Sequence, residues 1–102
     1  FFDSVVSYND QIALEVIRAL EDAGLKVPED VSVTGYDDSY LASSGKVPLT
    51  TVAHPQEKLG EMAAELLLGL LKEGSIPESE RQILVKPELV IRESCRSRKK
   101  EE

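Results

Sequence analysis

The chain has one cysteine, one histidine and no tryptophan, and each of these shortages argues against a class of function. With Cys95 as its single thiol the chain cannot form an internal disulfide, which favours a reducing, cytoplasmic setting. Aromatic residues make up only 5% of the sequence, too few for a base-stacking surface that binds single-stranded nucleic acid. No apolar run approaches the roughly 20 residues that a membrane span needs. The composition therefore predicts a soluble globular domain that does not enter a membrane.

Positive charge is also scarce, and the net charge of −7 is a poor match for a phosphate backbone. The exception is the segment 92–102, which holds five basic residues. We expect residues 1–95 to form the domain and residues 96–102 to be a charged, disordered tail, with a basic contact arm as the alternative. The first residues, FFDSVV, already read as the lead-in to a strand, so the chain is predicted to be a piece of a longer protein.

The usual signatures of catalysis are missing as well. There is no G-x-S-x-G elbow, no paired cysteine and histidine, and no glycine-rich phosphate loop. We therefore expect a binding domain without a cofactor and not an enzyme. One enzymatic alternative stays open, because carboxylates at sheet ends do bind Mg²⁺. It is a magnesium-dependent phosphotransfer or hydrolase domain that uses Asp10, Asp37 and His54, with Asp38 as a further metal ligand.

The sequence does have short β-branched runs that alternate with helical patterns. The runs predict buried strands at 3–8, 31–36 and 49–53, and two further short strands at 82–86 and 88–92. The helical periodicity predicts helices at 11–24 and 55–74, each with an apolar stripe and a terminal glycine. The stripes are Ile12, Ala13, Val16, Ile17, Leu20 and Ala23 in the first helix, and Leu59, Met62, Ala63, Leu66, Leu67 and Leu70 in the second. This order predicts an α/β fold with an open, mostly parallel sheet flanked by helices.

Polar residues follow each of the first three strands: Asn9-Asp10, Asp37-Asp38 and His54. In an open parallel sheet, ligands bind outside the carboxyl ends of the strands, so these side chains should share a site for a small polar ligand. Asn9 or Asp10 should cap the helix, which leaves the other side chain free. Asp37 can accept hydrogen bonds from neighbouring hydroxyls, while Asp38 is better explained as a turn residue that bonds its own backbone. His54 is an alternative helix cap.

Leu14 stands apart from the first helical stripe, at roughly 130° from its centre. An isolated exposed leucine needs no explanation. The alternative is a self-association face that Leu14 shares with the polar loop 37–48, which contains Tyr40 and Leu41.

Three motifs in this order, YND, VPEDVSVTGYDD and PLTTV, carry a family resemblance that extends to the closing ELVIRESC. The chain resembles the C-terminal part of the effector-binding domain of lactose- and galactose-repressor-type transcriptional regulators. The resemblance implies that Asn9 and Asp37 contact a sugar or purine effector, and that His54 reaches the ligand. It also implies that Leu14, Arg18 and the loop 39–46, with Tyr40 and Leu41, form a homodimer interface. The wording HPQE at 54–57 is similar to the arabinose-responsive subgroup.

The family fold is of the type I periplasmic-binding-protein kind, so the chain should be a truncated C-terminal subdomain of it. Operator DNA would be bound only through an N-terminal domain outside this chain. A fragment without the other wall of the cleft should bind its effector weakly or not at all. The alternative within the same fold is a fragment of a periplasmic sugar-binding transport protein.

Overall fold

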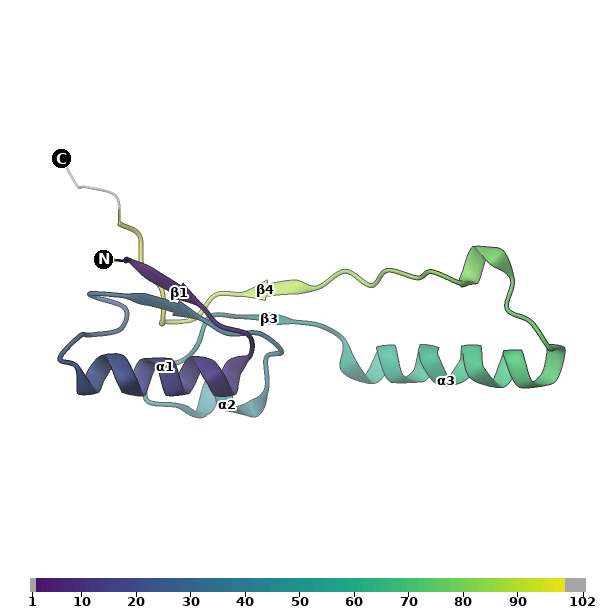
Figure 1. The fold of residues 1–102 in the computed structure, drawn as a ribbon, viewed down its shortest axis with the longest axis horizontal. Coiled ribbons are helices and arrows are strands. Elements are labelled where there is room, and N and C mark those ends of the chain that lie inside the picture. Colours follow the sequence, from purple (N-terminus) through teal and green to yellow (C-terminus); the bar gives the residue numbers. More distant parts are fainter. Residues whose placement is uncertain (1, 99–102) are drawn as a thin grey trace. The chain divides into compact units, whose positions relative to one another are not determined.

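The computed structural model describes residues 2–98 (Figure 1). Along the chain the elements are β1 (Ser4–Val6), α1 (Asp10–Asp22), β2 (Ser32–Thr34), α2 (Tyr40–Ser44), β3 (Thr51–Ala53), α3 (Gln56–Glu73), the 3-10 helix η1 (Glu78–Glu80) and β4 (Glu88–Val90). Within the described residues they belong to two compact units, one formed by residues 2–53 with 88–98 and the other by residues 54–87. Within residues 2–98 no helix combines the length and the apolarity that crossing a membrane requires.

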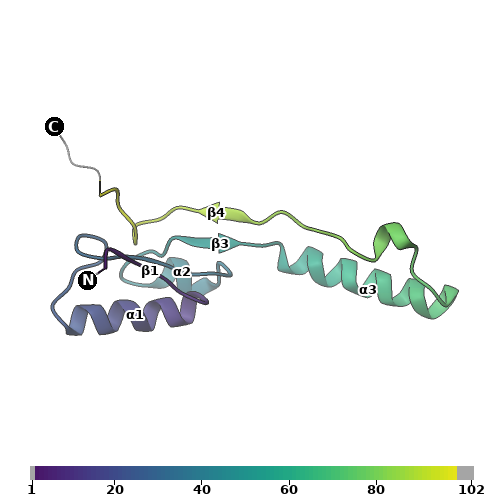
Figure 2. The ribbon, with the colours of Figure 1, turned by 45° about the horizontal axis from the view of Figure 1, so that its top comes forward.

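The strands of the first unit form two small sheets, β1 with β2 and β3 with β4, where one mostly parallel sheet was expected. β1 pairs in parallel with β2, with Val5 opposite Val33. Two isolated parallel bridges link the two sheets. Thr34 of β2 pairs with Thr50, which directly precedes β3, and Asp37, which lies beyond β2, pairs with Ala53 of β3. β4 then pairs antiparallel with β3, with Thr51 opposite Val90. In Figures 1 and 2, α1 lies along one side of β1 and β2. The carboxyl ends of the three parallel strands therefore meet at one edge.

The core of this unit lies between α1 and the sheet. Its buried apolar residues are Ala13, Ile17, Leu20, Val27, Val31, Val33, Ala42 and Leu49. The prediction that β1 is buried is wrong, because the side chain of Val6 is 83% exposed. No described element covers the face of β1 on which Val6 lies, whereas Val5 on the other face packs partly against the core.

The buried stripe of α1 differs from the predicted one by a small rotation about the helix axis. Ala13, Ile17 and Leu20 are buried as expected, but Ile12 is exposed and Leu14 is half-buried against the core. Leu14 lies only about a quarter turn from the mean direction of the buried residues at 100° per residue. The expectation that Leu14 stands on the far side of the helix is therefore wrong, because the predicted stripe included Ile12.

The polar loop 37–48 is partly helical. α2 occupies Tyr40–Ser44, and its Ala42 is fully buried in the core. The backbone N–H of Leu49 donates to the Ala42 carbonyl at 2.7 Å, which ties the residue after this segment to α2. α2 in turn packs against α1.

The start of the predicted disordered tail is held in place. Arg98 donates from Nη1 to the Glu29 carbonyl at 2.7 Å and from Nη2 to the Pro28 carbonyl at 2.8 Å. Arg96 donates from Nε to the same Glu29 carbonyl at 3.0 Å. These arginines, which belong to the segment expected to be a tail, thus bond the loop before β2 through planar guanidinium groups that match several carbonyl acceptors at once. Residues 99–102 of the predicted tail lie outside the described residues.

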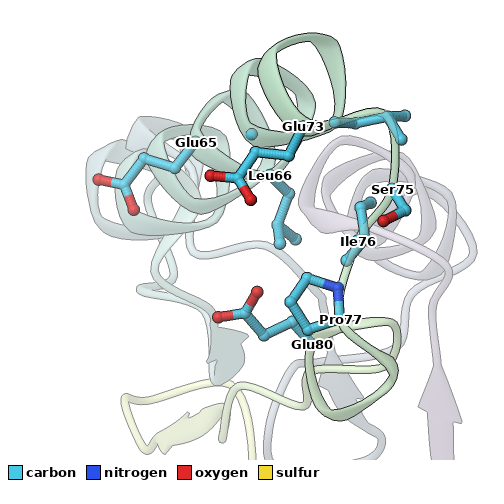
Figure 3. Close-up of a pocket in the computed structure, with 9 residues that line it drawn as sticks. Glu65, Leu66, Glu73, Ser75, Ile76, Pro77 and Glu80 are labelled. Carbon is cyan, nitrogen blue, oxygen red and sulfur yellow. The ribbon is translucent and has the colours of Figure 1, made fainter.

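The second unit contains α3 and η1. α3 ends at Gly74, which adopts a left-handed conformation with φ 77° and donates its N–H to the Leu70 carbonyl, as the glycine position predicted. Pro55 occupies the capping position and not the first helical one. Residues of α3, η1 and the turn between them line a hollow of about 180 Å³. Figure 3 shows lining side chains from both elements, among them Leu66 and Glu73 of α3 and Glu80 of η1.

Two predictions for the second unit are wrong. No residue of α3 is buried, so its leucine stripe does not face a core within the described residues. Residues 82–86 form no strand in this part of the chain, and the Leu84 side chain is 90% exposed. Both predictions assumed a packing partner, which one long helix and a 3-10 turn do not provide for each other.

Candidate functional site

Backbone hydrogen bonds bring the ends of β1, β2 and β3 together. The Asp10 N–H donates to the Tyr36 carbonyl at 3.1 Å, which ties the end of β1 to the end of β2. The Asp37 N–H donates to the Val52 carbonyl at 2.9 Å and ties the same segment to β3. The predicted convergence of the strand ends is therefore present for the residues that follow β1 and β2.

Asn9 is the N-cap of α1. Its Oδ1 accepts a hydrogen bond from the Ile12 N–H at 2.9 Å, which fixes the orientation of the amide because only the oxygen can accept. The capping bond uses the oxygen alone, so the two N–H donors of Nδ2 are not spent on the helix. Asn9 can therefore both cap the helix and donate to a ligand.

Replacing Asn9 separates these two roles. Asn9→Ala should lower the free energy of unfolding by about 1 kcal/mol, because a capping oxygen is lost. Asn9→Ser retains a capping oxygen but lacks the amide donors, so it should keep the stability and lose the predicted ligand contact. Denaturant unfolding and ligand titration of both variants measure the two effects. Equal losses of stability in the two variants would contradict the assignment of the cap.

Tyr8, Tyr36 and Asp37 line a hollow of about 330 Å³ at this edge of the sheet. The Tyr8 side chain is 84% exposed, Tyr36 is also exposed and Asp37 is half-buried. Small-molecule sites of roughly this size combine aromatic walls with a few polar groups that fix the orientation of the ligand. A sugar suits such walls because its ring carries an apolar face and its hydroxyls can donate to a carboxylate.

Neither tyrosine was predicted as a ligand contact from the sequence. The signal for them was present: the chain has only three tyrosines, and two of them directly precede the polar pairs Asn9-Asp10 and Asp37-Asp38. In a chain with so few aromatic residues, two rings at converging strand ends indicate side chains that line a ligand site.

Asp10 and Asp38 are engaged within the protein. Asp10 is only 1% exposed, and its carboxylate accepts from Thr51 Oγ1 and from the Ser39 N–H, each at 2.6 Å. The expectation that the side chain beside the cap is free for ligand is therefore wrong. Asp38 Oδ1 pairs with Arg92 Nη2 at 2.7 Å, so Asp38 bonds an arginine where a bond to its own backbone was expected. Nowhere in residues 2–98 do three His, Cys, Asp or Glu side chains form a group that could hold a metal ion.

His54 is the first residue of the second unit, and it is half-buried. Its carbonyl accepts from the Gln56 N–H at 2.8 Å. The N-cap residue of α3 is Pro55, one position after His54. The contact of His54 with a ligand stays a prediction.

The residues predicted to mediate self-association differ in exposure. Tyr40 is 79% exposed and Arg18 is also exposed, whereas Leu14 and Leu41 are half-buried. Leu14, Arg18 and Lys46 help to line a shallow hollow of about 360 Å³, beside a surface ion pair of 3.9 Å between Lys46 and Glu21. Tyr40 and Arg18 are thus the accessible members of the predicted interface.

Residues 3–95 match the family model of the periplasmic binding protein-like domain, and the chain belongs to this family. The arabinose metabolism transcriptional repressor of Halalkalibacterium halodurans is 37% identical over 100 residues, which cover 95% of this chain and 27% of the relative. The HTH-type transcriptional repressor PurR of Photobacterium profundum is 39% identical over 94 residues, which cover 91% and 27%. The chain spans about a quarter of the length of these curated relatives.

Solved structures support the same family. The transcriptional regulator CelR in its cellobiose complex has a TM-score of 0.83 and 35% identity, and the match covers 90% of this chain and 28% of that one. A LacI family transcriptional regulator from Enterococcus faecalis, solved with bound ribose, has a TM-score of 0.82 and 33% identity, with coverage of 91% and 34%. The resemblance inferred from the three motifs is confirmed, as is the α/β fold class.

Proposed function

We propose that this chain is the ligand-sensing part of a sugar-responsive transcriptional repressor. The observation that carries the proposal is the hollow lined by Tyr8, Tyr36 and Asp37. Asn9 follows Tyr8 in the chain, and its helix-capping bond uses only the amide oxygen. The regulators with cellobiose or ribose bound support a sugar as the effector. Asp37 accepts from ligand hydroxyls, Asn9 donates, and the tyrosines pack against the ring. The chain acts by binding and not as an enzyme, and it needs no cofactor.

The repressor binds operator DNA through a domain outside this chain, since the net charge of −7 opposes contact with phosphates. The effector binds one conformational state of the protein better than the other, and this difference in affinity changes the occupancy of the operator. The protein works in the cytoplasm, where its DNA is.

The test begins with the protein that contains this chain and a panel of arabinose, ribose, cellobiose, lactose and sucrose. Thermal-shift measurements identify the sugar that stabilises the protein, because a ligand that binds only the native state raises the melting temperature. Footprinting with and without that sugar then measures operator occupancy. Sugar binding without any effect on DNA binding would favour the transport alternative over the repressor.

We also propose that the repressor is a homodimer and that the surface around α1 and α2 forms the interface. Tyr40 and Arg18 are large and exposed there. Tyrosine and arginine are enriched at protein–protein interfaces and among the residues that contribute most to binding. Leu14 and Leu41 lie half-buried behind them and supply the apolar part.

The dimer interface is tested with Tyr40→Asp. Leu14→Asp is the less informative variant, because Leu14 also packs against the core of its own chain. Tyr40→Asp places a charge in the proposed dimer interface without removing a core contact, so the dimer dissociation constant should rise at least about tenfold. Sedimentation equilibrium measures this change, and Lys26→Asp on the exposed loop after α1 is the control. A Tyr40→Asp protein that associates like the wild type would reject this surface.

A further inference from the structure

The backbone that carries Asp37 is strained. Asp37 has φ 108° and Asp38 has φ 51°, so two consecutive residues with side chains lie in the left-handed region. Such conformations cost free energy for any residue other than glycine, and they persist only where surrounding contacts impose them. The position of the Asp37 carboxylate therefore depends on what holds this turn.

Three successive backbone N–H groups of the turn find acceptors in two other elements. The Asp37 N–H donates to the Val52 carbonyl at 2.9 Å, and the Asp38 N–H points to Thr51 Oγ1 at 3.4 Å. The Ser39 N–H donates to Asp10 Oδ2 at 2.6 Å. Thr51 Oγ1 in turn donates to Asp10 Oδ1 at 2.6 Å. The Asp10 carboxylate thus accepts both from the Ser39 N–H at the end of the turn and from the Thr51 hydroxyl that faces the Asp38 N–H.

Asp10 is suited to this role by its burial and by its charge. It is 1% exposed, and its two oxygens accept short, charge-assisted hydrogen bonds, which are the stronger kind. On the other side of the turn, Asp38 is held by Arg92, whose Nη1 also donates to the Leu49 carbonyl at 3.0 Å. The segment therefore has a buried anchor at Asp10 and a half-buried anchor at Arg92.

We propose that Asp10 is a positioning residue for ligand binding: its buried carboxylate holds the turn 37–39 in the strained conformation that presents Asp37 to the hollow lined by Tyr8 and Tyr36. This inference rests on the proposed function, because it assigns a purpose to a contact that does not touch the ligand. Without the Asp10 carboxylate, the turn relaxes toward ordinary backbone angles and Asp37 leaves the hollow.

The matched variants are Asp10→Asn and Ser94→Ala. Asp10→Asn preserves the shape of the side chain but directs an amide group at either the Ser39 N–H or the Thr51 hydroxyl. Ser94→Ala removes an equally buried group that accepts from the Thr50 N–H and donates to the Val33 carbonyl, and neither partner belongs to the turn. Both variants remove buried hydrogen bonds, but only Asp10→Asn releases the turn.

The first measurement needs no ligand. In amide NMR spectra of the protein that contains this chain, Asp10→Asn should move the Ser39 resonance upfield and speed hydrogen exchange at residues 37–39. Ser94→Ala should leave these amides unchanged. Wild-type positions and exchange rates for residues 37–39 in Asp10→Asn would overturn the inference.

The second measurement is calorimetric titration with the sugar from the panel that stabilises the wild type. Asp10→Asn should weaken binding at least about tenfold, and Ser94→Ala less than about threefold. Equal weakening by the two variants would show a purely structural role for Asp10 and would overturn the inference. If the wild type binds no sugar of the panel, that result counts against the proposed function, and the amide measurement alone decides the role of Asp10.

Discussion

Asp37→Gly is expected to weaken sugar binding by about 10- to 150-fold while leaving the protein at least as stable as the wild type. Removing an acceptor that is charged costs about 1.5 to 3 kcal/mol of binding free energy, because ligand hydroxyls lose their partner in a partly buried site. The stability moves in the other direction because glycine adopts φ 108° without the strain that aspartate carries there. Calorimetric titration and denaturant unfolding of the same preparation measure both quantities.

Opposite changes in affinity and stability distinguish this result from general damage. Asp22→Ala, which removes an exposed carboxylate at the end of α1, is the control and should change neither quantity appreciably. Asp37→Asn retains the size of the side chain and its tolerance for positive φ, so it isolates the contribution of the charge. Wild-type affinity in both Asp37 variants would remove Asp37 from the site and with it the main support for sugar binding.

The elements that depend on local pattern were predictable from the sequence. α1 was expected at 11–24 and is found at Asp10–Asp22, and α3 ends at the expected Gly74. Capping by Asn9 or Asp10 was also expected, and Asn9 performs it. These features follow from periodicity and from the chemistry of helix ends, which involve residues a few positions apart.

The features that were missed depend on contacts between distant residues. The burial of Asp10 rests on Thr51, 41 positions along the chain, and no local pattern distinguishes a buried carboxylate from a solvated one in the first turn of a helix. The docking of Arg98 rests on the Pro28 carbonyl, 70 positions away. The exposure of α3 was missed for the opposite reason, because an apolar stripe predicts a buried face without specifying its partner.

Gly35, which directly follows β2, is constrained by such contacts with distant residues. A Cβ at position 35 would clash with Asp10 Oδ1 and would lie 2.7 Å from Leu49 Cδ2. Both neighbours are fully buried, so neither has space into which it can move. Gly35 is therefore required because the Asp10 carboxylate and the Leu49 side chain pack against its backbone.

Gly35→Ala is expected to lower the free energy of unfolding by about 3 kcal/mol, from overpacking and from the displaced hydrogen bonds of Asp10. Gly60→Ala is the matched control, because nothing lies within 4 Å of a Cβ there and alanine favours helix interiors, so stability should rise by up to about 1 kcal/mol. In an Asp10→Ala background, Gly35→Ala should cost less, since the oxygen that it displaces is gone. Denaturant unfolding of the wild type, Gly35→Ala, Asp10→Ala and the double variant measures this coupling. Strictly additive losses would mean that position 35 and the Asp10 carboxylate do not share the space that the structure assigns to them.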